Sequence, residues 1–181
     1  SSTFLDGSVS NNLTIQGTYT LGDGAATALK GTINNNGLIN YSNASASTAS
    51  LLIDGAVNLQ GTGKVTMGGS GPNQIRFNGN PTGDTLNSYQ TIEGKGTIAV
   101  LFHNTPGHLV DANISGQTLS LTATTTNGEG SVIQSSNAAT LSLNNISVTN
   151  IGATIQAVGA GATVELNAST IHGGTLINAG A

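Results

Sequence analysis

Residues 118–121 read Thr-Leu-Ser-Leu, residues 140–143 repeat Thr-Leu-Ser-Leu, and residues 163–166 read Thr-Val-Glu-Leu. Each segment alternates apolar and polar residues, which is typical of a short strand with one buried face. The segments recur at a step of about 22 residues, a period that indicates a repeat architecture. Such a coil cannot bury its inner face alone, so we expect successive coils to stack with Leu119, Leu141 and Val164 in one column.

Other residues share this step, although the spacing is less regular toward the N-terminus. Irregular spacing predicts insertions in the turns, at residues 41–50 and 68–73. Asn and Thr side chains at the turns are expected to form hydrogen-bonded ladders along the stack. We predict three further columns: Val110 with Val132 and Thr154; Asp111 with Ile133, Ile155 and Ile177; Ile92 with Ile114.

The composition agrees with an all-β fold. Hydrophobic residues make up 36% of the chain and charged residues 7%, and Asn, Thr, Ser and Gly dominate the rest. Helix-favouring residues are rare, whereas turn and strand residues are common. We predict that residues 1–181 form a single all-β domain, a right-handed parallel β-helix (β-solenoid) of roughly eight coils of about 22 residues.

Charge and cysteine content exclude several function classes. Four isolated basic residues (Lys30, Lys64, Arg76 and Lys95) cannot form the positive surface that nucleic acid requires, and the net charge is −4. The absence of cysteine removes disulfides and thiolate metal sites. Apolar runs are too short for a membrane span of about 20 residues, so we expect no membrane insertion by this segment.

Two short stretches resemble a known group of proteins. Residues 91–98 read TIEGKGTI after LNSY at residues 86–89, and residues 174–180 read GTLINAG. These phrases resemble bacterial autotransporter passenger domains and filamentous-haemagglutinin-type surface adhesins. The resemblance implies a right-handed parallel β-helix, export from the cell, and adhesion or structural display. Because the chain begins and ends in repeat-like sequence, we expect it to be a fragment of a larger surface protein.

We therefore expect a non-catalytic structural or adhesive segment of a secreted or surface-displayed bacterial protein. Its expected location is extracellular, at the bacterial cell surface. Its expected partners are a host or matrix glycan or protein and the neighbouring domains of the same long chain, with no cofactor and no metal.

Polar and aromatic residues between positions 89 and 111 are the candidates for a binding site. We predict that Tyr89, His103, His108 and Asp111 contribute to it, with 103–108 forming a loop. The two histidines with Asp111 could also bind a metal, but a solvated loop is the favoured interpretation. The Asp-Gly pairs that begin at Asp6, Asp23 and Asp54 are interpreted as tight turns rather than calcium sites.

Two alternative functions stay open on the same scaffold. A polysaccharide-degrading enzyme would require two carboxylates close together. At a step of about 22 residues no two of the eight acids share a column, so a catalytic pair is not expected. An ice-binding solenoid would require threonine columns. Thr97, Thr118 and Thr140 approach one, and Thr163 continues it one residue out of step.

Overall fold

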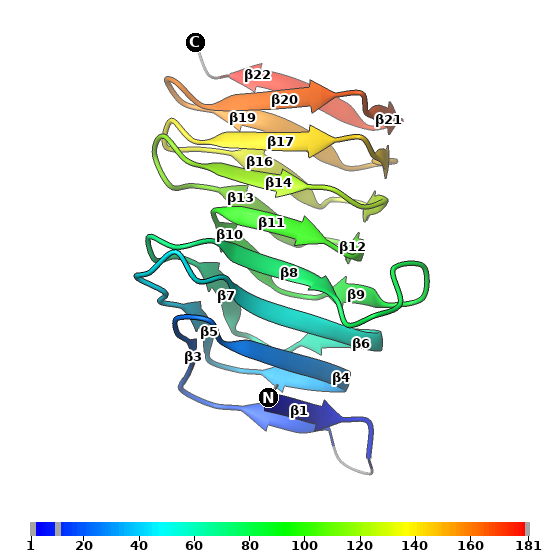
Figure 1. Ribbon diagram of the computed structural model, residues 1–181. Coiled ribbons are helices and arrows are strands. Elements are labelled where there is room, and N and C mark those ends of the chain that lie inside the picture. The colour runs from blue at the N-terminus through cyan, green and yellow to red at the C-terminus, as the bar shows by residue number, and fades with distance from the viewer. Residues whose placement is uncertain (1–2, 10–11, 180–181) are drawn as a thin grey trace.

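Every regular element of the protein is a β-strand. The computed structural model describes residues 3–9 and 12–179, and within these ranges the chain forms the strands β1 to β22 and no helix. The strands stack in parallel as a right-handed β-solenoid of about eight coils (Figure 1). The predicted fold class is confirmed. Among the described residues, no helix is long and apolar enough to span a membrane.

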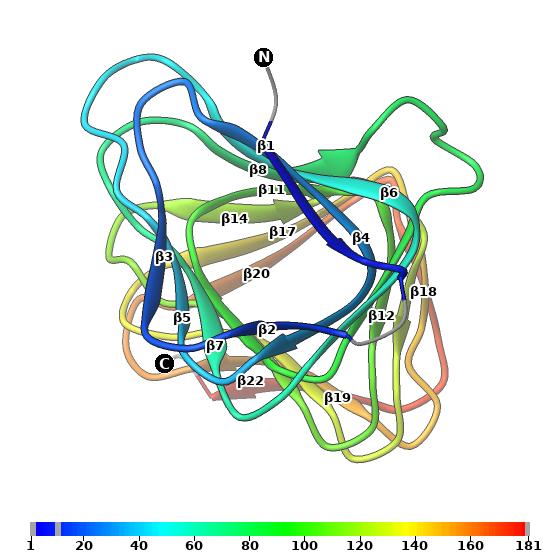
Figure 2. The ribbon, with the colours of Figure 1, turned by 90° about the horizontal axis from the view of Figure 1, so that it is seen from below.

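Three faces run along the solenoid and enclose one core (Figure 2). Face 1 contains the first part of β4 (Ala26–Asn35) and of β6 (Ala49–Gln60) together with β1 (Thr3–Gly7), β8 (Asn73–Phe77), β11 (Gly96–Ala99), β14 (Thr118–Leu121), β17 (Thr140–Asn144) and β20 (Thr163–Asn167). Face 2 contains the second part of β4 and of β6 together with β2 (Leu13–Ile15), β9 (Thr85–Ser88), β12 (Leu101–Asn104), β15 (Thr125–Asn127), β18 (Ser147–Thr149) and β21 (Thr170–His172). Face 3 is a separate 8-stranded sheet of β3 (Thr18–Leu21), β5 (Leu38–Tyr41), β7 (Lys64–Met67), β10 (Thr91–Gly94), β13 (Leu109–Ala112), β16 (Val132–Ser135), β19 (Thr154–Val158) and β22 (Thr175–Ala179).

The leucine column on face 1 forms as predicted. Leu119 pairs with Leu141, and Leu141 pairs with Val164, in parallel register. Leu119 and Leu141 are fully buried, because alternate residues of each strand point into the core. The core continues without interruption from Ile15 to Ile155, and the stacking of like aliphatic residues holds neighbouring coils together.

Two of the columns predicted on face 3 are wrong by one residue. Val110 pairs with Ile133 rather than with Val132, and Val132 pairs with Leu109 on one side and Thr154 on the other. The coil from Leu109 to Val132 is one residue longer than the coil from Val132 to Thr154, so a constant step assigns the wrong partner.

The same cause displaces Asp111, which pairs with Gln134 instead of Ile133. Farther along, Ile155 does pair with Ile133, but its other partner is Leu176 and not Ile177.

The predicted pairing of Ile92 with Ile114 is also wrong. Ile92 pairs with Val110, because the coil that contains them is unusually short.

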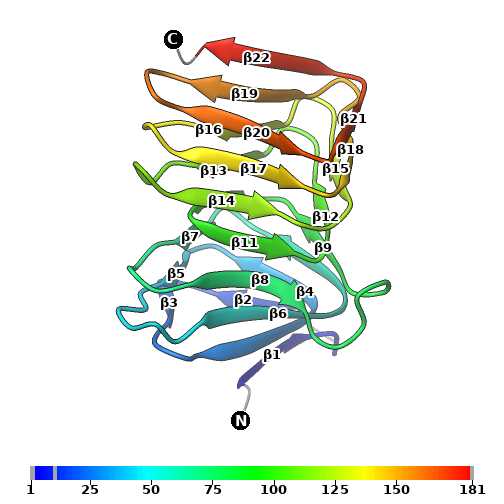
Figure 3. The same ribbon diagram turned by 45° about the horizontal axis from the view of Figure 1, so that its top comes forward.

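Insertions occur in the turns of the N-terminal coils, as predicted. Residues 42–48 and 68–72 connect face 3 to face 1. A third insertion, residues 78–84 between β8 and β9, was not predicted and projects from the side of the solenoid (Figure 3). Along face 2, Asn58 and Asn87 are register partners 29 residues apart, whereas Asn87 and His103 are only 16 residues apart.

A ladder of buried asparagines follows the corner between faces 2 and 3, which confirms the predicted turn ladder. Asn104 Nδ2 donates to Asn127 Oδ1 at 2.8 Å, and Asn127 Nδ2 donates to Asn150 Oδ1 at 2.8 Å. The amides also bond backbone carbonyl groups, such as that of Thr154 at 3.1 Å from Asn127. The ladder thus satisfies backbone groups at a corner where the sheets are interrupted.

Candidate functional site

A row of polar side chains crosses the outer surface of face 3. Its members are the outward residues that lie between buried residues on successive strands, and each is partly exposed to solvent. We define the face 3 row as Thr66, Glu93, Asp111, Gln134 and Gln156, which are register partners from β7 to β19. Parallel register places neighbouring members about 4.8 Å apart along the axis.

At the N-terminal end of the row, Glu93 is held by two neighbours. Lys64 Nζ forms an ion pair with Glu93 Oε1 at 2.6 Å, and Thr66 Oγ1 donates to the same oxygen at 3.0 Å. This is the only ion pair within the described residues. The Lys64 side chain is 48% exposed, so solvent weakens the attraction, and the contact serves mainly to orient Glu93.

Asp111 accepts hydrogen bonds from the next coil toward the C-terminus. Gln134 Nε2 donates to Asp111 Oδ2 at 3.0 Å, and Ser136 Oγ lies 3.0 Å from Oδ1. Gln156 Nε2 then donates to Gln134 Oε1 at 2.8 Å. These bonds fix the orientation of the amide groups before any ligand arrives.

Glu93 and Asp111 are themselves register partners on β10 and β13. The prediction that no two acids share a column is therefore wrong, and the cause is the short coil that also misplaced Ile92. Two adjacent carboxylates on an open sheet can accept hydrogen bonds from hydroxyl groups. Carboxylate pairs of this kind are also the minimum requirement for acid–base hydrolysis of a glycosidic bond.

The predicted site residues separate into three places. Asp111 lies in the face 3 row. Tyr89 and His108 meet at the corner between faces 2 and 3, with ring centroids 6.2 Å apart and an interplanar angle of 74°, an edge-to-face contact. His103 lies on β12 of face 2, where its Nδ1 is 2.8 Å from Asn87 Oδ1.

This separation bears on the alternative metal site. His103 lies in a strand, so the predicted loop is shorter than 103–108 and begins only after Asn104. His103 and Asp111 are on different sheets, and the described residues contain no group of three or more His, Cys, Asp or Glu side chains that could hold a metal ion.

Sequence reasoning missed most of the row. Thr66 and Glu93 gave no signal at the assumed step, because Thr66 and Glu93 are 27 residues apart and Glu93 and Asp111 are 18 residues apart. Gln134 and Gln156 did carry a signal, because the dipeptide Ile-Gln recurs at residues 133–134 and 155–156. They pair in register as that repeat suggests.

The Asp-Gly pairs have structural roles. Asp23-Gly24 lies in the turn between β3 and β4, as predicted, and Asp23 Oδ1 accepts from the backbone N–H groups of Ala44 and Ser45 at 2.7 and 2.8 Å. These bonds hold the pKa of Asp23 below its ordinary value, and the bond from Ser45 has the larger effect. For the other two pairs the predicted tight turn is wrong: they lie in β1 and β6, where the chain bends from face 1 to face 2.

Threonines stack over three coils of face 1. Thr118 pairs with Thr140, and Thr140 pairs with Thr163, so the predicted slip at Thr163 does not occur. Thr97 pairs instead with Ser120 and is not part of the column.

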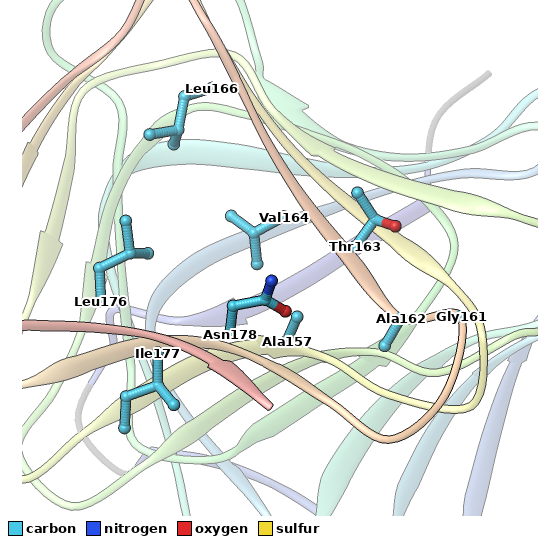
Figure 4. Close-up of a pocket in the computed structure, with 9 residues that line it drawn as sticks. All are labelled: Ala157, Gly161, Ala162, Thr163, Val164, Leu166, Leu176, Ile177 and Asn178. Carbon is cyan, nitrogen blue, oxygen red and sulfur yellow. The ribbon is translucent and has the colours of Figure 1, made fainter. Parts of the chain in front are cut away.

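A hollow of about 340 Å³ lies at the C-terminal end of the solenoid. Val164, Leu166 and Leu176 surround it, and no charged side chain lines it (Figure 4). Leu166 and Leu176 are 45% and 55% exposed, since no further described coil covers them. This hollow is the open side of the last coil's aliphatic core.

The face 3 row thus presents oriented polar side chains on five successive strands, in two hydrogen-bonded sets that adjoin at Glu93 and Asp111. Comparisons of the sequence with known protein families and with curated proteins, and of the structure with solved structures, find no match.

Proposed function

We propose that this chain is a non-catalytic structural and adhesive segment of a secreted or surface-displayed bacterial protein, and that it binds a glycan through face 3. The observation that carries the proposal is the face 3 row, in which polar side chains on five successive strands are oriented by hydrogen bonds with neighbouring strands. A hydroxyl-rich ligand needs donors and acceptors at regular intervals, and a parallel sheet supplies them at each strand.

Rigidity favours such binding. The row residues alternate with core residues such as Ile92 and Val110, which are fully buried. Binding therefore costs little conformational entropy in the protein, because the side chains are already ordered. Groups that are oriented before contact retain more of their interaction energy. Many weakly binding copies on one cell would reinforce one another by raising the effective concentration.

The test is a glycan array probed with the folded chain, followed by titration of any ligand found. Replacing both glutamines, Gln134→Ala with Gln156→Ala, should weaken binding by at least about tenfold, since each lost polar contact costs about 1 kcal/mol. The matched control is Ser120→Ala with Thr140→Ala on face 1, which should bind as the unmodified chain does.

Binding that responds equally to both double variants would place the ligand elsewhere. Absence of binding to any glycan would leave only the role of a spacer.

A second candidate function is favoured by one observation, the register pairing of Glu93 with Asp111. In a polysaccharide-degrading enzyme, one carboxyl group would protonate the leaving oxygen while the other attacks the sugar or activates water. A panel of polysaccharides would then be cleaved by the chain, and Glu93→Gln and Asp111→Asn would each abolish cleavage. Asp54→Asn, on face 1, is the control and should leave the activity unchanged. Inactivity over the whole panel removes this candidate.

A further inference from the structure

Three asparagines in the chain are followed by glycine, and their surroundings differ. They are Asn36, Asn78 and Asn127. An Asn-Gly pair can lose ammonia when the backbone nitrogen of the glycine attacks the asparagine side chain, because glycine leaves that nitrogen unhindered. The reaction requires both groups to be free to approach each other, so the fold decides which pair reacts.

Asn127 is locked in the corner ladder. It is 1% exposed, and its side chain bonds Asn104 and Asn150 at 2.8 Å each. The N–H of Gly128 donates to the Asn104 carbonyl oxygen at 2.8 Å. Neither reacting group can move without opening the ladder.

Asn36 is exposed, but both of its reacting groups are engaged. Its Oδ1 accepts from the Thr62 N–H at 3.2 Å, and the N–H of Gly37 donates to Asn35 Oδ1 at 3.2 Å. Gly37 also packs against the backbone of Gly17 in the coil below, which restricts its movement.

Asn78 and Gly79 begin the projecting insertion at residues 78–84 and are both exposed. Within the described part of the chain, neither the Asn78 carboxamide nor the Gly79 N–H forms a hydrogen bond. Apart from the two chain neighbours of Gly79, no residue lies within 4 Å of the place that a Cβ would occupy on Gly79. The Asn78 N–H donates to the Ile53 carbonyl oxygen at 2.8 Å and so holds the start of the loop, whereas the two reacting groups themselves are not engaged.

We propose that Asn78 is a site of spontaneous deamidation in the folded protein. The Gly79 nitrogen loses its proton to hydroxide and forms a bond to Asn78 Cγ. The bond from Cγ to Nδ2 then breaks, and ammonia leaves. Water opens the resulting succinimide at one of its two carbonyl groups, which gives aspartate or isoaspartate at position 78. One water is consumed and one ammonia is released.

The product would loosen the insertion. Asp84 is 4% exposed and anchors the loop by accepting from the N–H groups of Asn78 at 2.9 Å, Asn80 at 3.1 Å and Gly55 at 2.9 Å. A new carboxylate at position 78 adds a like charge next to this anchor. An isoaspartate linkage also adds one backbone carbon between the N–H groups of positions 78 and 80, so both cannot keep their places on Asp84.

The experiment is incubation of the folded chain at mildly alkaline pH, with peptide mapping by mass spectrometry over time. Conversion at Asn78 should approach the rate of the same peptide in denaturant and should increase with hydroxide concentration. Asn127 should react at least about 100-fold more slowly than in denaturant, because it must wait for local unfolding. Isoaspartate should be detected at position 78 by methyltransferase labelling and should be lost in Asn78→Gln.

Protease cleavage within 78–84 should become faster as conversion proceeds. The proposal is overturned if Asn36 or Asn127 converts as fast as Asn78 in the folded chain. It is equally overturned if Asn78 remains intact during the time in which the denatured chain reacts.

Discussion

At the scale of single residues, buried amide groups connect the coils. Asn127 shows how this works: one side chain bonds the asparagine below it, the asparagine above it and a backbone carbonyl of the next coil. Because these groups lie out of reach of water, each one needs its partner.

Replacing Asn127 with alanine should destabilise the protein by about 1–3 kcal/mol, because the Asn104 amide and the Asn150 carbonyl each lose a buried partner. Urea denaturation followed by circular dichroism measures the difference. Asn144→Ala, at an exposed position, is the control and should stay within about 0.5 kcal/mol. Equal midpoints for the two variants would contradict this role of the ladder.

The Asp23 carboxylate makes a contribution that depends on pH. Its pKa in the folded protein lies below the ordinary value of 3.8, because the backbone N–H groups of Ser45 and Ala44 bond the charged form. The stability that it adds is present above about pH 4 and is lost as the pH falls through the folded pKa. The stability difference between the protein and Asp23→Asn should therefore shrink on acidification from pH 7 to pH 3. A difference that stays constant over that range would show that the charge is not involved.

At the scale of elements, close stacking of strands restricts certain positions to small residues. Gly94, at the end of β10, has φ +123°, and a side chain there would collide with the Met67 carbonyl of the strand below. This position continues an inward column in which Gly94 is followed by Ala112 and Ser135.

Gly94→Ala should cost about 1–3 kcal/mol, through backbone strain and displacement of β7. Gly22→Ala is the matched control: Gly22 has no positive φ and no atom within 4 Å of the added carbon, so its stability should be unchanged or slightly higher. Thermal unfolding of both variants makes the comparison. Unaltered stability of Gly94→Ala would mean that β10 and β7 can move apart at little cost.

At the scale of the whole molecule, the described strands pair only with strands of adjacent coils, so stability should vary along the axis. Amide hydrogens of β13, which pairs with strands on both sides, should exchange at least about tenfold more slowly than those of β22, whose only partner among the described strands is β19. Hydrogen exchange with mass spectrometry measures this directly. Uniform protection from β13 to β22 would show that the solenoid opens only as a single unit.

The repeat at residues 118–121 and 140–143 was sufficient to predict the class of fold, because identical strands at one spacing can hardly pair in any other way. It was not sufficient for the register of the N-terminal coils. There, partners lie from 16 to 29 residues apart, and no local property of a strand indicates the length of the turn before it. The pairing of Glu93 with Asp111 was missed for this reason, whereas the pairing of Gln134 with Gln156 could be predicted.

The insertion at residues 78–84 indicates how the solenoid tolerates extra residues in a connection between strands. The long step from Asn58 to Asn87 is followed at once by the short step from Asn87 to His103, after which the stack returns to its usual phase. Strand positions are thus set by pairing between coils and not by the number of residues in a connection, so extra length in one connection does not propagate along the rod. A foreign peptide grafted between residues 79 and 83 should accordingly be carried on the outside without disturbing the alignment of later strands.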